Sequence, residues 1–260
     1  MNILKYTLLF SIILLLTFSC TPYYSPNGHN VPLFKKKNEA RISASVSTAA
    51  QPGGEIQTAY AVNNNIAIMF NTVISSVSEE GRKFNFYEFG AGYFNPLNKY
   101  IVIEVYGGAS LGLVRNNFYY TDPLEPINSD QKRSFIDVNF YKYWFQPSIG
   151  FSSNFVDLAL SLRIASLNFS NPQYNKSLFD KVDDRNNDVV SKLLNNKNSL
   201  LIEPVFTTRI GYKSIKLQIQ IGFSLNNTNP ELHSISNLVI YNMGIYFSLF
   251  DLFNKENKDK

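Results

Sequence analysis

The chain contains few of the residues from which catalytic, redox and metal sites are built. It has 260 residues, of which one is cysteine, two are histidine and only 17% are charged. The single thiol of Cys20 excludes an internal disulfide, and His29 and His233 are too far apart in sequence to indicate a zinc motif. The sequence also lacks a phosphate-binding glycine-rich loop and a nucleophile elbow. We therefore expect no catalytic residues, no cofactor and no metal ion.

The body of the chain also lacks clustered charge of one sign. The net charge of +4 comes partly from the lysines at 35–37 and from the lysine-rich tail after Asn254. Both runs flank the patterned region, so they do not form the basic face that nucleic-acid binding requires. Hydrophobic residues make up 45% of the chain and aromatic residues 15%, which is enough apolar material to exclude global disorder.

No apolar run is long enough for a transmembrane helix. The longest, at about 7–18, is shorter than the roughly 20 residues that a spanning helix needs and fits the apolar core of a signal peptide. It ends in Leu-Thr-Phe-Ser-Cys at 16–20, which resembles a bacterial lipobox, although Thr17 stands where leucine is usual. We predict a signal peptide and a lipid anchor on Cys20. The alternative is an ordinary signal peptide in which the cysteine has no role.

From residue 39 onward, apolar and polar residues alternate with a period of two. The clearest stretch is 215–226, where Ile215, Leu217 and Ile219 begin a row of apolar residues on one face. Alternation of this length predicts β-strands. We expect ten of them, at about 41–46, 55–62, 66–75, 83–94, 100–114, 135–152, 155–169, 200–213, 215–226 and 237–250.

The connections between these strands alternate in length. Those after the second, fourth, sixth and eighth strands are short, whereas 115–134 and 170–199 are the longest. Transmembrane barrels have this pattern, with tight periplasmic turns at one rim and long extracellular loops at the other. An even strand number closes the barrel without edges. We therefore predict an all-β fold, a transmembrane antiparallel up-and-down β-barrel of ten strands in a bacterial outer membrane, with eight or twelve strands as alternatives.

A soluble lipocalin-like barrel would show the same alternation with the apolar face inward. Here the apolar rows carry no charge, and the opposite rows carry small and amide side chains instead of the dense charge of a soluble surface. Aromatic residues also gather near the short turns, as in an interfacial girdle: Tyr93, Phe94, Tyr100, Phe151, Phe155, Tyr212 and Phe247. These features favour the membrane form. Pro147 and Pro204 fall inside strands and predict bulges or local strand ends.

The predicted limits of the barrel divide the chain into four parts. We expect a signal peptide at 1–19, a lipidated N-terminal periplasmic linker at 20–38, the barrel at 39–253 and a charged tail at 254–260. The linker is expected because residues 21–38 are rich in Pro, Asn, Gly and Lys and show no period. Both termini would then be periplasmic.

An outward apolar face makes the polar rows point into the lumen. We expect Trp144 opposite Arg163, and Glu88 and Glu104 as diagonal neighbours. The expected lumen network consists of Glu88, Glu104, Lys142, Trp144, Arg163, Glu203 and Arg209. Two interpretations stay open: a structural salt-bridge network that occludes a narrow barrel, which we favour, and a polar or proton path.

One stretch of sequence resembles a known group of proteins. Residues 24–34, YSPNGHNVPLF, followed by Glu39 and by QTAYAV at 57–62, resemble an uncharacterised group of Bacteroidota outer-membrane β-barrel lipoproteins. The resemblance covers mainly residues 23–70, and the lysines at 35–37 replace a more acidic stretch in that group. It implies a barrel lipoprotein, similar to accessory subunits of outer-membrane machines, at the level of the fold alone.

The predicted barrel is consistent with three functions. The first is a non-enzymatic structural or accessory component of an outer-membrane assembly, with outer-membrane lipid and other outer-membrane proteins as partners, contacted through loops 115–134 and 170–199. The second is a narrow channel for small solutes. The third is an outer-membrane hydrolase, which would use His233 with Asp180, Asp183 or Asp184 at the extracellular rim.

Overall fold

The computed structural model describes residues 24–47, 53–76, 83–120, 132–174, 197–228 and 239–249. Its strands are β1 (Ala40–Ser47), β2 (Gly53–Ala61), β3 (Ile66–Ser76), β4 (Lys83–Pro96), β5 (Ile101–Tyr120), β6 (Lys132–Ser152), β7 (Val156–Tyr174), β8 (Asn198–Tyr212), β9 (Ile215–Phe223), β10 (Leu225–Asn226) and β11 (Val239–Ser248). β9 and β10 both pair with β8 in one register, so they form a single strand interrupted at Ser224. The eleven elements therefore make ten strands.

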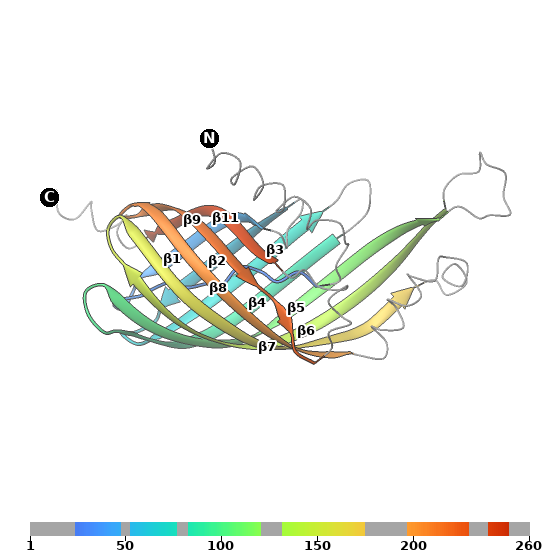
Figure 1. Ribbon diagram of the computed structural model, residues 1–260, viewed down its shortest axis with the longest axis horizontal. Helices are drawn as coiled ribbons and strands as arrows, with labels where there is room; N and C mark the ends of the chain where they lie inside the picture. The colour runs from blue at the N-terminus through green and yellow to red at the C-terminus, as the bar shows by residue number, and fades with distance from the viewer. Residues whose placement is uncertain are drawn as a thin grey trace, which may run out of the picture.

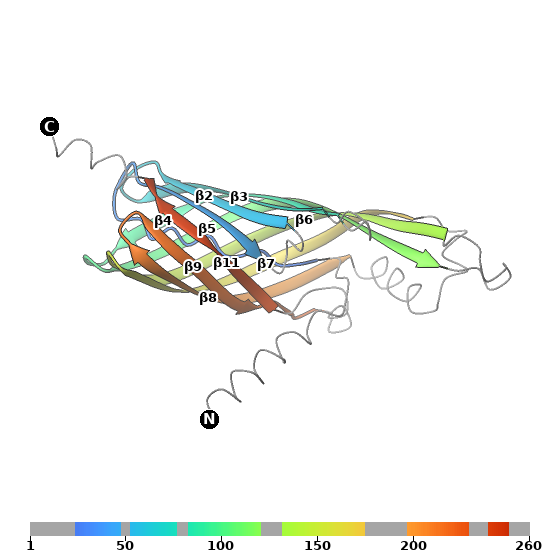
Figure 2. The same cartoon turned by 90° about the horizontal axis from the view of Figure 1, so that it is seen from above.

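The strands form a closed barrel (Figures 1 and 2). Each strand pairs antiparallel with its neighbour in sequence, β1 pairs with β11, and the pairing of β8 with β9 completes the ring. In both views β5 and β6 extend beyond the other strands at one end. The predicted ten-stranded antiparallel up-and-down barrel is confirmed. Among the described residues, no helix has the length and apolar character needed to cross a membrane.

The two rims of the barrel differ. The short-turn rim carries the connections 62–65, 97–100, 153–155 and 213–214. The long-loop rim is the opposite end, where the strands join the longer connections. β11 ends at Ser248, whose N–H donates to the carbonyl of Ser214, so the described chain ends at the short-turn rim.

Alternation places large apolar side chains on the outside of every strand. Exposed examples from successive strands are Val46, Ile56, Ile68, Phe89, Leu111, Phe145, Leu160, Phe206, Ile221 and Ile245. A barrel with an outward apolar band is of the outer-membrane type, because lipid is the solvent that such a surface suits. Near the short-turn rim the outward rings of Tyr100 and Phe151 stack 5.6 Å apart, and those of Phe155 and Tyr212 lie 5.4 Å apart. Phe94, expected in this girdle, instead points inward and is fully buried.

Two turns have a register that differs from the predicted one. β4 continues through Pro96, and Asn98 Oδ1 accepts the N–H groups of Tyr100 and Ile101. Glu88 therefore lies opposite Ser110, and Glu104 opposite Phe94. The prediction that the two glutamates are diagonal neighbours was wrong, because side-chain capping moved the turn along the chain.

The turn between β6 and β7 is also shifted. Ser153 pairs with Val156 through the Ser153 N–H and the Val156 carbonyl at 3.0 Å. This places Trp144 opposite Ala165 and not opposite Arg163. The Ser153 hydroxyl, which accepts from the N–H of Val156 at 3.1 Å, explains why the turn forms here.

The prolines interrupt pairing without shifting the register around them. The ladder between β6 and β7 skips Gln146 and Pro147 and resumes in the same register. Pro204 pairs with Leu162 of β7, while on its other side the ladder with β9 stops at Val205 and resumes with β10 at Ile202. The register shift of the β6–β7 ladder occurs instead between Asp137 and Asn139. β6 and β8 both continue through their prolines, so the bulges or strand ends predicted at Pro147 and Pro204 are not found there; the prolines only interrupt pairing with one neighbouring strand.

Candidate functional site: the filled lumen

The lumen contains the chain's own N-terminal segment. Residues 24–35, the lumen segment, have no regular ladder, and almost all of their side chains are buried inside the barrel. The prediction that residues 20–38 form a periplasmic linker was wrong for residues 24–35, which lie inside the barrel. The physical reason is that the stretch from Tyr24 to Phe34 carries no charged side chain, while the barrel wall offers many buried donors and acceptors.

Wall side chains bind the backbone of the lumen segment along its length. Donors from the wall reach its carbonyls: Gln220 to His29 at 2.6 Å, Gln146 to Asn30 at 2.9 Å, Arg209 to Val31 at 2.8 Å and Tyr246 to Pro32 at 3.1 Å. Carboxylates of the wall accept its amides: Glu55 from Gly28 at 3.2 Å and Glu104 from Phe34 at 3.1 Å. Side chains of the wall thus bind four carbonyls and two amides of a segment that has no ladder partner.

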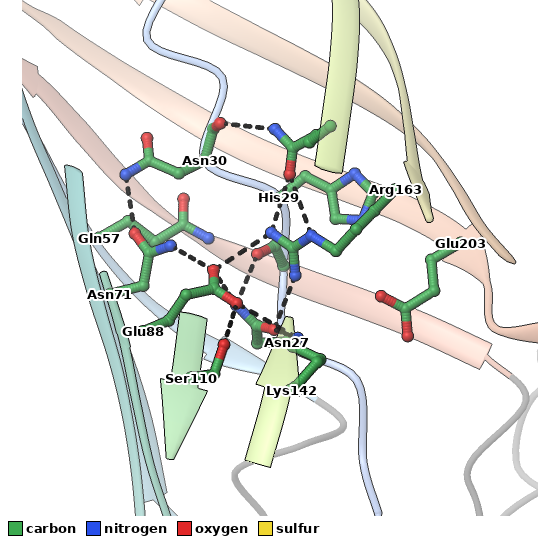
Figure 3. A network of polar contacts seen from close by, with 12 residues as sticks. Asn27, His29, Asn30, Gln57, Asn71, Glu88, Ser110, Lys142, Arg163 and Glu203 are labelled. Carbon is green, nitrogen blue, oxygen red and sulfur yellow. Dashed lines mark hydrogen bonds and ion pairs between the residues drawn. The ribbon is translucent and has the colours of Figure 1, made fainter. Parts of the chain in front are cut away.

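The centre of the lumen is an ion cluster around Glu88, which is fully buried (Figure 3). Its carboxylate lies 3.2 Å from Arg163 Nη2 and 3.2 Å from Lys142 Nζ. Asn71 and Ser110 donate to the same carboxylate at 2.7 Å and 3.0 Å. One carboxylate between two cations leaves excess positive charge, which the polar oxygens nearby help to solvate.

The lumen segment completes this cluster. Asn27 Oδ1 accepts from Arg163 Nη1 at 2.9 Å and from Lys142 Nζ at 3.2 Å, and Asn27 Nδ2 donates to Glu88 at 3.4 Å. Figure 3 shows Asn27 lying between the side chains of β4, β6 and β7. One uncharged amide therefore bridges both cations and the carboxylate.

Trp144 covers one side of the cluster. The Arg163 guanidinium lies 5.0 Å from the centre of its ring, so the expected contact forms even though the register differs. The indole rests on Gly90 and Gly108, which lie opposite each other on β4 and β5. A Cβ at either glycine would approach the ring to 2.6–2.7 Å, so these positions have room only for glycine.

The other predicted network residues lie apart from Glu88. Glu203 accepts from the Tyr24 hydroxyl at 3.2 Å and from Ser224 at 2.9 Å. Arg209 lies over the Tyr246 ring at 4.0 Å. Glu104 lies near the short-turn rim, where it binds Phe34. The structure places all seven predicted residues inside the barrel, but in four groups that the lumen segment connects.

The long-loop end of the described lumen is apolar. Phe140 stacks with Phe84 and Phe86 at 6.0 and 5.8 Å, and Tyr24 meets the same ring edge-on at 5.7 Å. Their neighbours in the same cluster include Val114, Val138, Leu167, Phe169 and Leu201. The lumen is therefore polar in the middle and lined by aromatic and aliphatic side chains at its long-loop end.

Sequence reasoning missed Asn27, His29 and Asn30 because it treated their stretch as a linker. His29 is fully buried, and its Nδ1 lies 2.7 Å from Ser161 Oγ. Asn30 donates to Asn71 at 2.7 Å. A signal was present: an uncharged stretch with Tyr24, Val31 and Phe34 just before the first strand is unusual for a solvated linker.

Several predicted features lie outside the described residues. These are the signal peptide and Cys20, the acidic residues Asp180, Asp183 and Asp184, His233, and the tail at 254–260. Most of loops 115–134 and 170–199 also lies there. Among the residues that are described, no group of three or more His, Cys, Asp or Glu side chains could hold a metal ion.

Comparison with known proteins adds little. No family model matches the chain, and no curated protein does. Among solved structures, LpxR from Salmonella typhimurium is similar over 80% of this chain and 99% of its own, with 8% sequence identity and a TM-score of 0.35. A likeness at this level does not bear on activity.

Proposed function

We propose that this chain is a non-enzymatic outer-membrane barrel that acts as a structural or accessory component of an outer-membrane assembly. The observation that carries the proposal is the filled lumen. The cations and carboxylates at its centre are bound to one another and to the lumen segment, and the groups around Glu88 are fully buried. A solute pathway would need these groups to face water.

The channel is the second candidate, because the barrier is a segment and not the wall alone. If the lumen segment left the barrel, a polar lumen lined by Glu55, Glu88, Arg163 and Gln220 would remain. The structure thus supports a sealed state and identifies what would have to move to open it.

Copurification tests the accessory role. Tagged protein should leave mild detergent with a stoichiometric outer-membrane partner, identified by mass spectrometry, and deletion of loop residues 121–131 or 175–196 should release it. A matched control is an insertion of the same tag at the short turn 62–65, which should retain the partner. A protein that purifies alone from every detergent and conducts ions in bilayers would contradict the accessory role and favour the channel.

We also propose that Cys20 carries the lipid. A fatty-acid probe added to growing cells should label the wild-type protein, because the only cysteine ends the apolar segment of the signal peptide. The Cys20→Ala protein should show no label. Equal labelling of the two proteins would contradict lipidation.

A further inference from the structure

The order of contacts gives the lumen segment a direction. At the short-turn rim, Lys35 Nζ donates to the carbonyl of Ser152, and Leu33 packs on Gly150. Further into the barrel, His29 meets Ser161 and Asn27 meets Glu88. Tyr24 comes last. The described segment therefore runs from Tyr24, inside the lumen, to the short-turn rim, where the N–H of Asn38 donates to the carbonyl of Ala61 and β1 begins.

The position of Tyr24 marks how far the segment reaches. Its hydroxyl binds Glu203, which lies five residues inside β8 and pairs with Arg163, and its ring meets Phe140. The eleven residues from Tyr24 to Phe34 span at most about 36–40 Å when extended. This is comparable to the roughly 30 Å of a bilayer's hydrocarbon core. Leu33 has a φ of 52°, so the segment is not fully extended and its span is shorter than this upper bound.

The described wall packs closely around the lumen segment. Gly28 is so closely surrounded that a Cβ would approach Gln220 to 2.3 Å and Asn242 to 2.9 Å. Around Tyr24, the wall residues Phe84, Phe86 and Phe140 are at most 1% exposed. A second pass of chain beside the lumen segment would have to displace these side chains.

We infer that the protein is threaded through its own barrel, so that the chain before Tyr24 emerges at the long-loop rim, opposite the C-terminal end. Cys20 is four residues before Tyr24 and lies within about 14 Å of it even when the chain is fully extended. An acyl group on Cys20, which rests on the lipidation proposed above, would then enter the leaflet on the long-loop side. With the long loops outside, this is the outer leaflet, and the protein displays its lipid at the cell surface. On this proposal the two termini lie on opposite sides of the membrane, whereas the sequence pattern predicts both in the periplasm.

Epitope accessibility tests the threading. One epitope is inserted in each of four proteins: between Pro22 and Tyr23, within 121–131, at Asn64 in a short turn, or after Lys260. Folding of each protein is checked by heat-modifiable mobility on gels. On intact cells, antibody should detect the first two epitopes, and the last two only after the membrane is permeabilised.

The outcomes separate threading from orientation. If the Pro22 epitope behaves like the epitope at Asn64 and unlike the one in 121–131, threading is wrong. If the Pro22 and 121–131 epitopes are both hidden and the other two are exposed, threading holds and the proposed orientation of the barrel is wrong. A lipidation-deficient Cys20→Ala protein should give the same accessibility pattern as wild type, because the segment's contacts and not the lipid hold it in place. A pattern that changes in Cys20→Ala would overturn this.

Discussion

Arg163 has three polar partners inside the barrel, and its neighbours depend on it. It binds Glu88, Gln146 and Asn27 while its guanidinium lies against Trp144. Buried charges of this kind are balanced only as a set, since removing one partner leaves the others desolvated and unpaired. The stability of this cluster therefore depends on each charged member keeping its partners.

We expect Arg163→Ala to lower the free energy of unfolding by about 3–5 kcal/mol, because Glu88 loses one of its two cations inside the barrel. Urea unfolding in detergent micelles measures this. Arg115→Ala is the matched control: its pair with Asp137 at 2.5 Å is partly exposed, with side-chain exposures of 42% and 20%, and should be worth at most about 1 kcal/mol. Equal losses in the two variants would show that the buried cluster is not special.

Adjacent glycines on β5 provide a second residue-scale test. A Cβ on Gly108 would lie 2.0 Å from the carbonyl oxygen of Phe89 and 2.7 Å from the Trp144 ring, whereas one on Gly107 meets nothing closer than 3.5 Å. Gly108→Ala should therefore destabilise the barrel by about 1–3 kcal/mol through overpacking. Gly107→Ala should change the unfolding midpoint in urea little. The opposite ranking would mean that Trp144 does not rest on Gly108.

At the scale of elements, the strands were predictable and the lumen segment was not. Side chains alternate between lipid and lumen along a strand, so the period of two is visible in a single sequence. The ends of all ten strands lie within six residues of the predicted ends. The registers of the β4–β5 and β6–β7 pairs were not predicted, because they depend on the side chains of Asn98 and Ser153 capping backbone amides in the turns. The segment 24–35 is held by long-range contacts with the wall, which leave no period in its own sequence.

Trp144 allows the lumen segment to be tested directly, because it is the only tryptophan in the chain. It is 4% exposed, so acrylamide should quench its fluorescence weakly in wild type. Replacing residues 25–34 with a glycine-serine linker of equal length should increase quenching several-fold, since water and quencher enter the emptied lumen. The same replacement at 254–260 is the control and should have no effect. Unchanged quenching in the first variant would show that the segment does not shield Trp144.

At the scale of the whole molecule, the barrel and its N-terminal segment form one closed unit. The outward side chains form an apolar band that can contact lipid. The inward polar side chains bind the backbone of the lumen segment. A barrel that encloses its own chain needs no second protein to seal it. Its outer surface, its rims and the projecting ends of β5 and β6 are then the parts left for partners (Figure 2).

Conductance in planar bilayers tests the sealed lumen most directly. Purified wild-type protein, folded by heat-modifiable mobility, should show no steady current above background. The variant with residues 25–34 replaced by glycine-serine linker should conduct, because the polar wall is then open to water. Reproducible, ion-selective single-channel steps from the wild-type protein would contradict the account and make the channel its function.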